Sequence, residues 1–109
     1  MPVLYGLKTC DTCRKAIKAL EDAGQDVTFR DVRTEPLDDA LIARFIGAFA
    51  DALINKRSTT WRGLSETERS RSPEALLVEY PALMKRPVID TGRNLTLGWD
   101  KAVQLQHLG

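Results

Sequence analysis

The sequence predicts an α/β fold in which a β-α-β unit is followed by a helical insertion and then by a β-β-α unit. Two observations lead to this prediction. Short apolar runs of strand character stand near both ends of the chain, and apolar residues at helical spacing dominate its middle. With 109 residues and no internal repeat or low-complexity linker, the chain is expected to form a single domain, 1–109, with the helical insertion at approximately 35–85.

The β-α-β pattern occupies the first third of the chain. Residues 2–7 are expected to form a strand, in which Gly6 marks a close approach of another chain segment. From Asp11, apolar residues recur on one helical face as far as Gly24, a residue type that often ends helices. Residues 27–32 alternate as a second strand. A helical crossover between two strands implies that they pair in parallel.

The middle of the chain is expected to be helical. A long helix is predicted to begin at Pro36 and to carry apolar residues at a spacing of four as far as Leu53. A polar stretch, residues 55–60, interrupts this pattern. Ser72 precedes a second apolar helix, which Pro81 is expected to distort.

The end of the chain returns to strand character. Val88 and Ile89, a turn containing Gly92, and the run 95–97 predict a β-hairpin, and residues 99–108 a short terminal helix. Together with the first unit, this is the element order of a thioredoxin-like fold with an all-helical insertion in the middle.

Composition excludes several classes of function. The chain has 16 Lys and Arg against 15 Asp and Glu, so neither a nucleic-acid surface nor a polybasic membrane patch is expected. No apolar run approaches the roughly 18 residues of a membrane span, and no signal segment precedes the first motif. We therefore expect a cytoplasmic protein. Two cysteines and one histidine cannot fill a four-ligand zinc site, so neither a metal nor a bound cofactor is expected.

The chemistry is expected at the start of the first helix, where Cys10 and Cys13 form a CxxC motif. The unpaired amides and positive dipole end of a helix stabilise a thiolate, so Cys10 should have a lowered pKa and be nucleophilic. Cys13 lies one turn further on the same side and can attack a mixed disulfide formed at Cys10.

Other interpretations of these cysteines remain open. Cys13 lies on the apolar helix face, where a cysteine is often an inert core residue. A structural disulfide would close a very short loop and stabilise little. Thiol chemistry is the preferred interpretation, because the motif stands at a strand-to-helix junction.

Two arginines are candidates for binding an anion near Cys10. Arg57 lies in the polar break after the long helix, and Arg86 precedes Pro87. A guanidinium presents a planar fork of donors that suits an oxyanion or carboxylate. His107, the only histidine, is interpreted as a solvated residue near the chain end, without a role.

Four motifs stand in order along the chain: residues 5–16 (YGLKTCDTCRKA), 57–61 (RSTTW), 85–89 (KRPVI) and 98–99 (GW). Together they resemble the arsenate-reductase family in its broad sense, and the resemblance spans essentially the whole chain. This family includes glutaredoxin-coupled arsenate reductases, Spx regulators and YffB-type small reductases, and the YffB type is the most similar.

The resemblance implies a thioredoxin-like fold with a helical insertion. It matches Cys10 to the family's nucleophilic cysteine. It matches Arg86 to an arginine that precedes a cis-proline, here Pro87, and that faces the cysteine. The residues expected to bind substrate are Lys8, Thr9, Arg57, Arg86 and Pro87.

The sequence also departs from the arsenate reductases of this family. Those enzymes have an arginine where Asn55 stands here, and Arg57 is two residues later. Their third anion-binding arginine falls near Leu97, with Arg93 as a nearby candidate. The position of Cys13 is a cysteine in Spx but not in those enzymes. The arsenate cradle is thus incomplete, and a dithiol mechanism becomes available.

The leading hypothesis is a thiol-dependent reductase in which the Cys10 thiolate attacks a disulfide, a glutathione mixed disulfide or an oxyanion such as arsenate. Glutathione is the expected co-substrate, with glutaredoxin or thioredoxin as possible partners. One alternative is an Spx-type redox sensor that binds RNA polymerase, and another is arsenate reductase proper. The sequence does not identify the substrate, the electron donor or the oligomeric state.

Overall fold

The structure is a computed structural model that describes residues 2–109. The chain divides into two compact units, one comprising Met1–Asp31 with Arg86–Gly109 and the other comprising Val32–Lys85. The first unit contains all the β-strands of the described residues, whereas the second contains only helices and 3-10 turns. Whether the whole chain folds as a single domain stays a prediction.

The first unit begins with the predicted β-α-β arrangement. Strand β1 (Val3–Gly6) leads into helix α1 (Asp11–Asp22), and strand β2 (Thr28–Asp31) follows. β1 and β2 pair in parallel, as predicted. The residue Gly24 has a φ of 85°, which a glycine adopts without strain, and it reverses the chain between α1 and β2.

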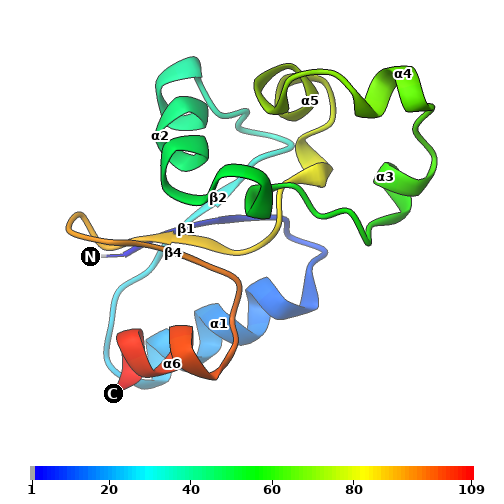
Figure 1. Cartoon of the computed structure of the whole chain (residues 1–109). Helices are drawn as coiled ribbons and strands as arrows, with labels where there is room; N and C mark the ends of the chain where they lie inside the picture. The colour runs from blue at the N-terminus through cyan, green and yellow to red at the C-terminus, as the bar shows by residue number, and fades with distance from the viewer. Residues whose placement is uncertain (1) are drawn as a thin grey trace. The chain divides into compact units, whose positions relative to one another are not determined.

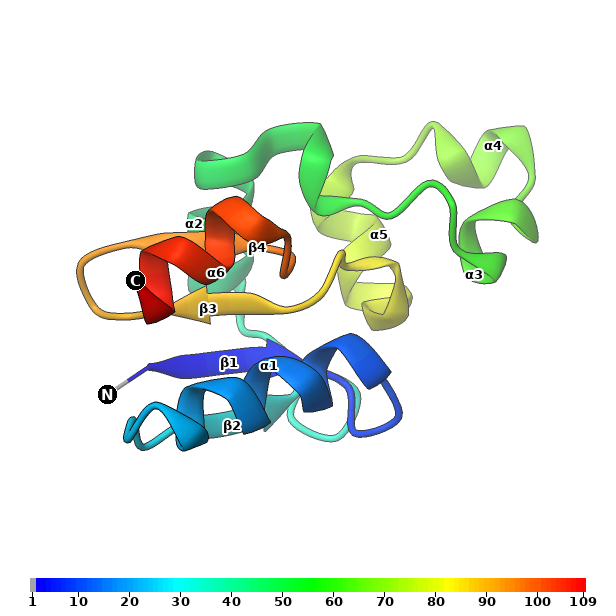
Figure 2. The same cartoon turned by 90° about the horizontal axis from the view of Figure 1, so that it is seen from below.

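The C-terminal part of the first unit completes the sheet. Strands β3 (Val88–Asp90) and β4 (Leu95–Leu97) form the predicted antiparallel hairpin, and helix α6 (Lys101–Leu108) follows. β3 also pairs antiparallel with β1, which gives the strand order β2-β1-β3-β4. Figures 1 and 2 show α1 and α6 side by side on one face of this sheet.

The core of the first unit lies between α1 and the sheet. Cys13, Ala16 and Leu20 recur along the inner face of α1 and are fully buried. They pack with Leu4 of β1 and Ile89 of β3. The apolar face of α1 that the sequence pattern identified is therefore the face that closes the core, and Cys13 is one of its members.

The second unit is helical, but its first helix is shorter than predicted. It begins at Asp39 rather than at Pro36, because the Asp38 side chain accepts a hydrogen bond from the Leu41 N–H and caps the helix. It ends at Phe49, because Ala50 has a φ of 51° and a 3-10 turn carries the chain on to Leu53. The elements are α2 (Asp39–Phe49), η1 (Ala50–Leu53), α3 (Thr59–Arg62), α4 (Glu66–Arg69), α5 (Pro73–Glu79) and η2 (Pro81–Leu83).

Main-chain hydrogen bonds join the residues that follow η1 to those that follow η2. Ile54 and Met84 form an isolated antiparallel bridge. Beside it, the Asn55 N–H donates to the Leu83 carbonyl at 2.8 Å and the Lys85 N–H donates to the Leu53 carbonyl at 2.7 Å. The bridge therefore closes the part of the segment from α3 to η2 on itself just before Arg86.

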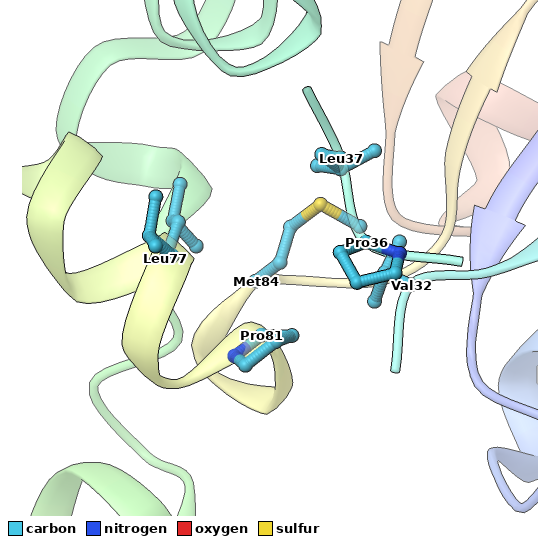
Figure 3. A pocket seen from close by; sticks show the side chains of 7 residues that line it. Val32, Pro36, Leu37, Leu77, Pro81 and Met84 are labelled. Carbon is cyan, nitrogen blue, oxygen red and sulfur yellow. The ribbon is translucent and has the colours of Figure 1, made fainter. Parts of the chain in front are cut away.

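A small apolar cavity of about 50 Å³ lies within the second unit (Figure 3). The side chains around it belong to the segment after β2 and to the region of α5 and η2. They are Val32, Pro36, Leu37, Leu77, Val78, Pro81 and Met84. None of the residues expected to bind substrate lines this cavity.

Candidate active site

Cys10 stands at the junction between β1 and α1. Its N–H donates to the Leu7 carbonyl at 3.1 Å, which closes a tight turn after the strand. Its φ and ψ of −85° and 114° are those of a residue that caps a helix, and its carbonyl accepts from the Arg14 N–H as the first bond of α1. Cys10 therefore lies at the helix N-terminus, where main-chain amides have no partners within the helix.

The surroundings of Cys10 favour its thiolate. Burial raises the pKa of Cys10, but three hydrogen bonds outweigh it, from the Cys13 main-chain N–H, the Cys13 thiol and the Arg86 side chain. The positive charge of Arg86 acts in the same direction, and the net pKa is below the usual cysteine value. Cys10 is half-buried and is a free thiol. The Cys10 sulfur is therefore accessible to a substrate and favours the thiolate form, as a nucleophile requires.

Cys13 has the opposite character. It is fully buried, and burial together with the neighbouring Cys10 raises its pKa to about 12. At neutral pH Cys13 is therefore a thiol that donates a hydrogen bond to the Cys10 sulfur. Its sulfur also lies against the backbone of Gly6, where a Cβ would overlap it. This contact is the close approach that the sequence predicted at Gly6.

The sheet register brings Arg86 to the same edge as Cys10. β1 and β3 are antiparallel and Tyr5 pairs with Val88, so the end of β1 lies beside the start of β3. Arg86 and Pro87 immediately precede β3, and their peptide bond is cis. Pro87 is fully buried, and its carbonyl accepts from the Gly98 N–H at 2.8 Å. The Arg86 side chain reaches Cys10, as the resemblance implies.

Lys8 and Thr9 have exposed side chains in the turn before Cys10. The Lys8 N–H donates to the Oδ2 atom of Asp31 at 2.9 Å. Sequence reasoning missed Asp31, because its contact with Lys8 depends on the parallel pairing of β1 with β2. That the Lys8 and Thr9 side chains bind substrate stays a prediction.

The remaining candidates have different outcomes. Arg57 is exposed and belongs to the second unit, and its part in binding an anion stays a prediction. Arg93 is exposed in the β3–β4 turn.

The interpretation of His107 as a solvated residue is wrong. Its Nε2 atom lies 2.8 Å from the Thr96 hydroxyl, its ring stacks on Trp99, and burial lowers its pKa.

Residues 2–109 contain neither a cluster of metal-ligating side chains nor a helix able to cross a membrane. No group of three or more His, Cys, Asp or Glu side chains in this range is arranged to hold a metal ion. Within the same range, no helix has the length and apolar character that crossing a membrane would require.

The sheet topology and the position of the cysteine pair define a thioredoxin-like protein with a cysteine motif at the start of its first helix. The chain belongs to the ArsC family, whose model matches residues 5–106.

Three relatives illustrate the range of this family. The structure of a protein named YFFB has a TM-score of 0.87 and 26% identity, and the match covers the whole of both chains. An arsenate reductase (ArsC) related protein from Brucella melitensis has a TM-score of 0.76 and 36% identity, covering 96% of this chain and 91% of that one. The global transcriptional regulator Spx of Bacillus subtilis is 30% identical over 93% of this chain and 82% of its own length.

Proposed function

We propose that the protein is a thiol oxidoreductase in which Cys10 is the nucleophile. The observation that carries this proposal is the contrast between the two cysteines. Cys10 lies at the N-terminus of α1 with a lowered pKa, and Cys13 is buried with a pKa of about 12. Membership of the ArsC family and the arsenate reductase-related neighbour support the same class of chemistry.

The proposed substrate is a disulfide, with a glutathione mixed disulfide as the preferred case. The Cys10 thiolate attacks one sulfur of R–S–S–R′, which forms Cys10–S–S–R and releases R′–S⁻ to take up a proton from water. Arg86 lies beside the reacting sulfur, where its positive charge stabilises the negative charge of the transition state. In the arsenate alternative, the same guanidinium binds an oxyanion oxygen.

Two routes resolve the intermediate. In the first, Cys13 loses its proton to water and attacks the Cys10 sulfur, which gives a Cys10–Cys13 disulfide and R–S⁻. In the second, a glutathione thiolate attacks the R sulfur of the mixed disulfide, which forms G–S–S–R and restores the Cys10 thiolate. After the first route, the Cys10–Cys13 disulfide must be reduced by two electrons from an external dithiol such as glutaredoxin or thioredoxin. The raised pKa of Cys13 makes the first route slow unless that pKa falls when the Cys10 charge is lost.

Turnover of defined substrates tests the proposal. The protein is incubated with glutathione, glutaredoxin, NADPH and glutathione reductase, and with either a panel of glutathione mixed disulfides or arsenate. We expect NADPH consumption above that of the same mixture without the protein, and we expect Cys10→Ser to abolish this excess. Loss of activity in Cys13→Ser indicates the first route, and retention indicates the second. Absence of turnover by protein with a reactive Cys10 would contradict the proposal.

An Spx-type redox sensor is the second candidate, because Spx of B. subtilis is 30% identical to this chain. In that function, oxidation of Cys10 and Cys13 to a disulfide changes the binding of RNA polymerase. Pull-down of purified RNA polymerase by the reduced and oxidised forms tests it. Oxidation-dependent binding without turnover would favour the sensor over the reductase.

A further inference from the structure

Asp31 is a buried carboxylate beside the cysteine motif. It is the last residue of β2, and only 8% of its surface is exposed. Its Oδ2 atom accepts a hydrogen bond from the Lys8 N–H at 2.9 Å. Burying a carboxylate is costly unless it is hydrogen-bonded. One group that compensates its burial is therefore a main-chain N–H of the loop that leads to Cys10.

This loop is the tight turn from Leu7 to Cys10. Its ends are joined by the hydrogen bond from the Cys10 N–H to the Leu7 carbonyl. Lys8 is the first residue inside the turn, so the bond to Asp31 fixes the turn from a second direction. Asp31 itself is fixed by the sheet, because it pairs with Gly6 in the parallel register of β1 and β2. The turn is thus attached to two adjacent strands.

We infer that Asp31 is a positioning residue, whose carboxylate holds the turn from Leu7 to Cys10 so that the Cys10 sulfur stays at the N-terminus of α1 beside Arg86. The inference rests on the proposed role of Cys10 as the nucleophile. Hydrogen bonds weaken steeply as distance and angle depart from their optimum. A turn that loses its attachment to Asp31 therefore gives the thiolate less stabilisation from the Cys13 amide and the Arg86 guanidinium.

Two other roles for Asp31 make different predictions. If its negative charge acted directly on Cys10 by repulsion, removing the charge would favour the thiolate. If Asp31 were only structural, its loss would lower stability and leave the reactivity of Cys10 unchanged. Asp31→Asn removes the charge and keeps an oxygen that can accept the Lys8 N–H, whereas Asp31→Ala removes both.

Asp100→Ala is a matched control. The Asp100 carboxylate also accepts one main-chain N–H, that of Val103, at 2.9 Å. It is an exposed residue of the same unit that caps α6, and it makes this bond within its own helix. Its replacement removes a similar hydrogen bond together with a helix cap, and therefore lowers the midpoint of urea unfolding. It should leave the chemistry of Cys10 as it is in the parent.

The readout is the rate of Cys10 alkylation by iodoacetamide as a function of pH, followed by mass spectrometry of the Cys10 peptide. We expect Asp31→Ala to slow alkylation at pH 7 by roughly tenfold and to shift its pH profile upward, since the thiolate is the reacting form. Asp31→Asn and Asp100→Ala should stay within about twofold of the parent, because the Lys8 bond persists in both. Faster alkylation in both Asp31 variants would overturn the inference in favour of direct repulsion.

Alkylation of Cys10 at the parent rate in folded Asp31→Ala would also overturn the inference that Asp31 is a positioning residue. If Asp31→Ala does not fold, hydrogen exchange of the Lys8 amide in the parent protein and in Asp31→Asn decides the matter. Protection of this amide in both supports the inference, and rapid exchange in the parent contradicts it. Alkylation needs no substrate, so the inference and the proposed function fail separately. A parent protein with the expected labelling pattern but no turnover would contradict only the function.

Discussion

The sulfur of Cys13 fills the space that a side chain on Gly6 would require. Gly6 is the last residue of β1, an inner strand of the sheet, and its φ is not among the positive values found at Gly24, Gly92 and Gly98. The absence of a side chain at this position is therefore explained by space and not by backbone conformation. It allows β1 and α1 to pack closely directly below Cys10.

Replacement of Gly6 by alanine should destabilise the protein. The new methyl group would overlap the Cys13 Sγ and lie 3.3 Å from its Cβ, and overpacking of this kind costs about 1–3 kcal/mol. Urea unfolding measures the loss of free energy of unfolding. The double variant Gly6→Ala/Cys13→Ala should recover part of this loss, because the overlapping atom is gone.

Gly47→Ala is the matched control. Gly47 lies within α2, and a Cβ there meets no atom within 4 Å. The Gly47→Ala substitution should be neutral or stabilise the protein by up to about 1 kcal/mol, because alanine favours the helix. Equal unfolding energies for the Gly6 variant and the parent would mean that α1 moves away at no cost.

The sequence was sufficient to predict the sheet and α1, because their signals are local. Alternating apolar residues, the period of α1 and the turn glycines all lie within a few positions of one another. The start of α2 was predicted at Pro36 because proline is common in the first turn of a helix. The actual cap is Asp38, a residue type that commonly caps helices, and the sequence analysis did not identify it. The end of α2 at Ala50 is not marked by a glycine or proline at that position.

The site was predictable where a motif carried it. Cys10 and Cys13 follow from their spacing and the strand-to-helix junction, whereas the place of Arg86 beside Cys10 required the antiparallel register of β1 and β3. Asp31 and His107 were missed because their partners, Lys8 and Thr96, contact them only through the tertiary fold. Side-chain burial of this kind leaves no periodic pattern in the sequence.

The two cysteines should differ in reactivity. The pKa of Cys10 is lowered and its side chain is half-buried, whereas Cys13 is fully buried with a pKa of about 12. In native protein at pH 7, Cys10 should therefore be alkylated at least roughly tenfold faster than Cys13. Cysteine-resolved labelling with iodoacetamide measures both rates, and unfolded protein in urea serves as the control in which they converge. Equal rates in the native protein, or faster labelling of Cys13, would overturn the assignment of the nucleophile.

His107 should make the stability of the protein depend on pH. Burial lowers its pKa below the usual value, so the unfolded chain binds a proton more readily than the folded one. By linkage, the contribution of neutral His107 is complete above the unfolded pKa of about 6.5 and is lost as the pH falls from there through the folded pKa. Urea unfolding at pH 7.5 and 5 compares the parent with His107→Gln, and the difference between them should shrink at the lower pH. A difference independent of pH would mean that the folded protein binds this proton as readily as the unfolded chain.

Arg86 should contribute both charge and geometry to the site. Burial raises the pKa of Cys10, and the Cys13 hydrogen bonds together with the Arg86 side chain bring it below the usual value. In Arg86→Lys the charge remains but the planar fork that binds two oxygens is lost. We expect this variant to keep most of the lowered pKa of Cys10 and to lose catalytic efficiency. Arg86→Ala should lose both, with a pKa of Cys10 that rises toward the usual value.

Thiolate absorbance against pH, measured beside the steady-state kinetics of the three proteins, separates the two contributions. Circular dichroism and urea unfolding establish that each variant is folded, and Arg93→Ala, an exposed arginine in the turn between β3 and β4, is the charge-matched control. This control should leave the pKa of Cys10 as it is in the parent, and its turnover tests whether Arg93 takes part in anion binding. If Arg86→Ala leaves the pKa of Cys10 unchanged, Arg86 does not stabilise the thiolate. If Arg86→Lys is fully active, the positive charge alone is sufficient and bidentate binding of an anionic substrate is not part of the reaction.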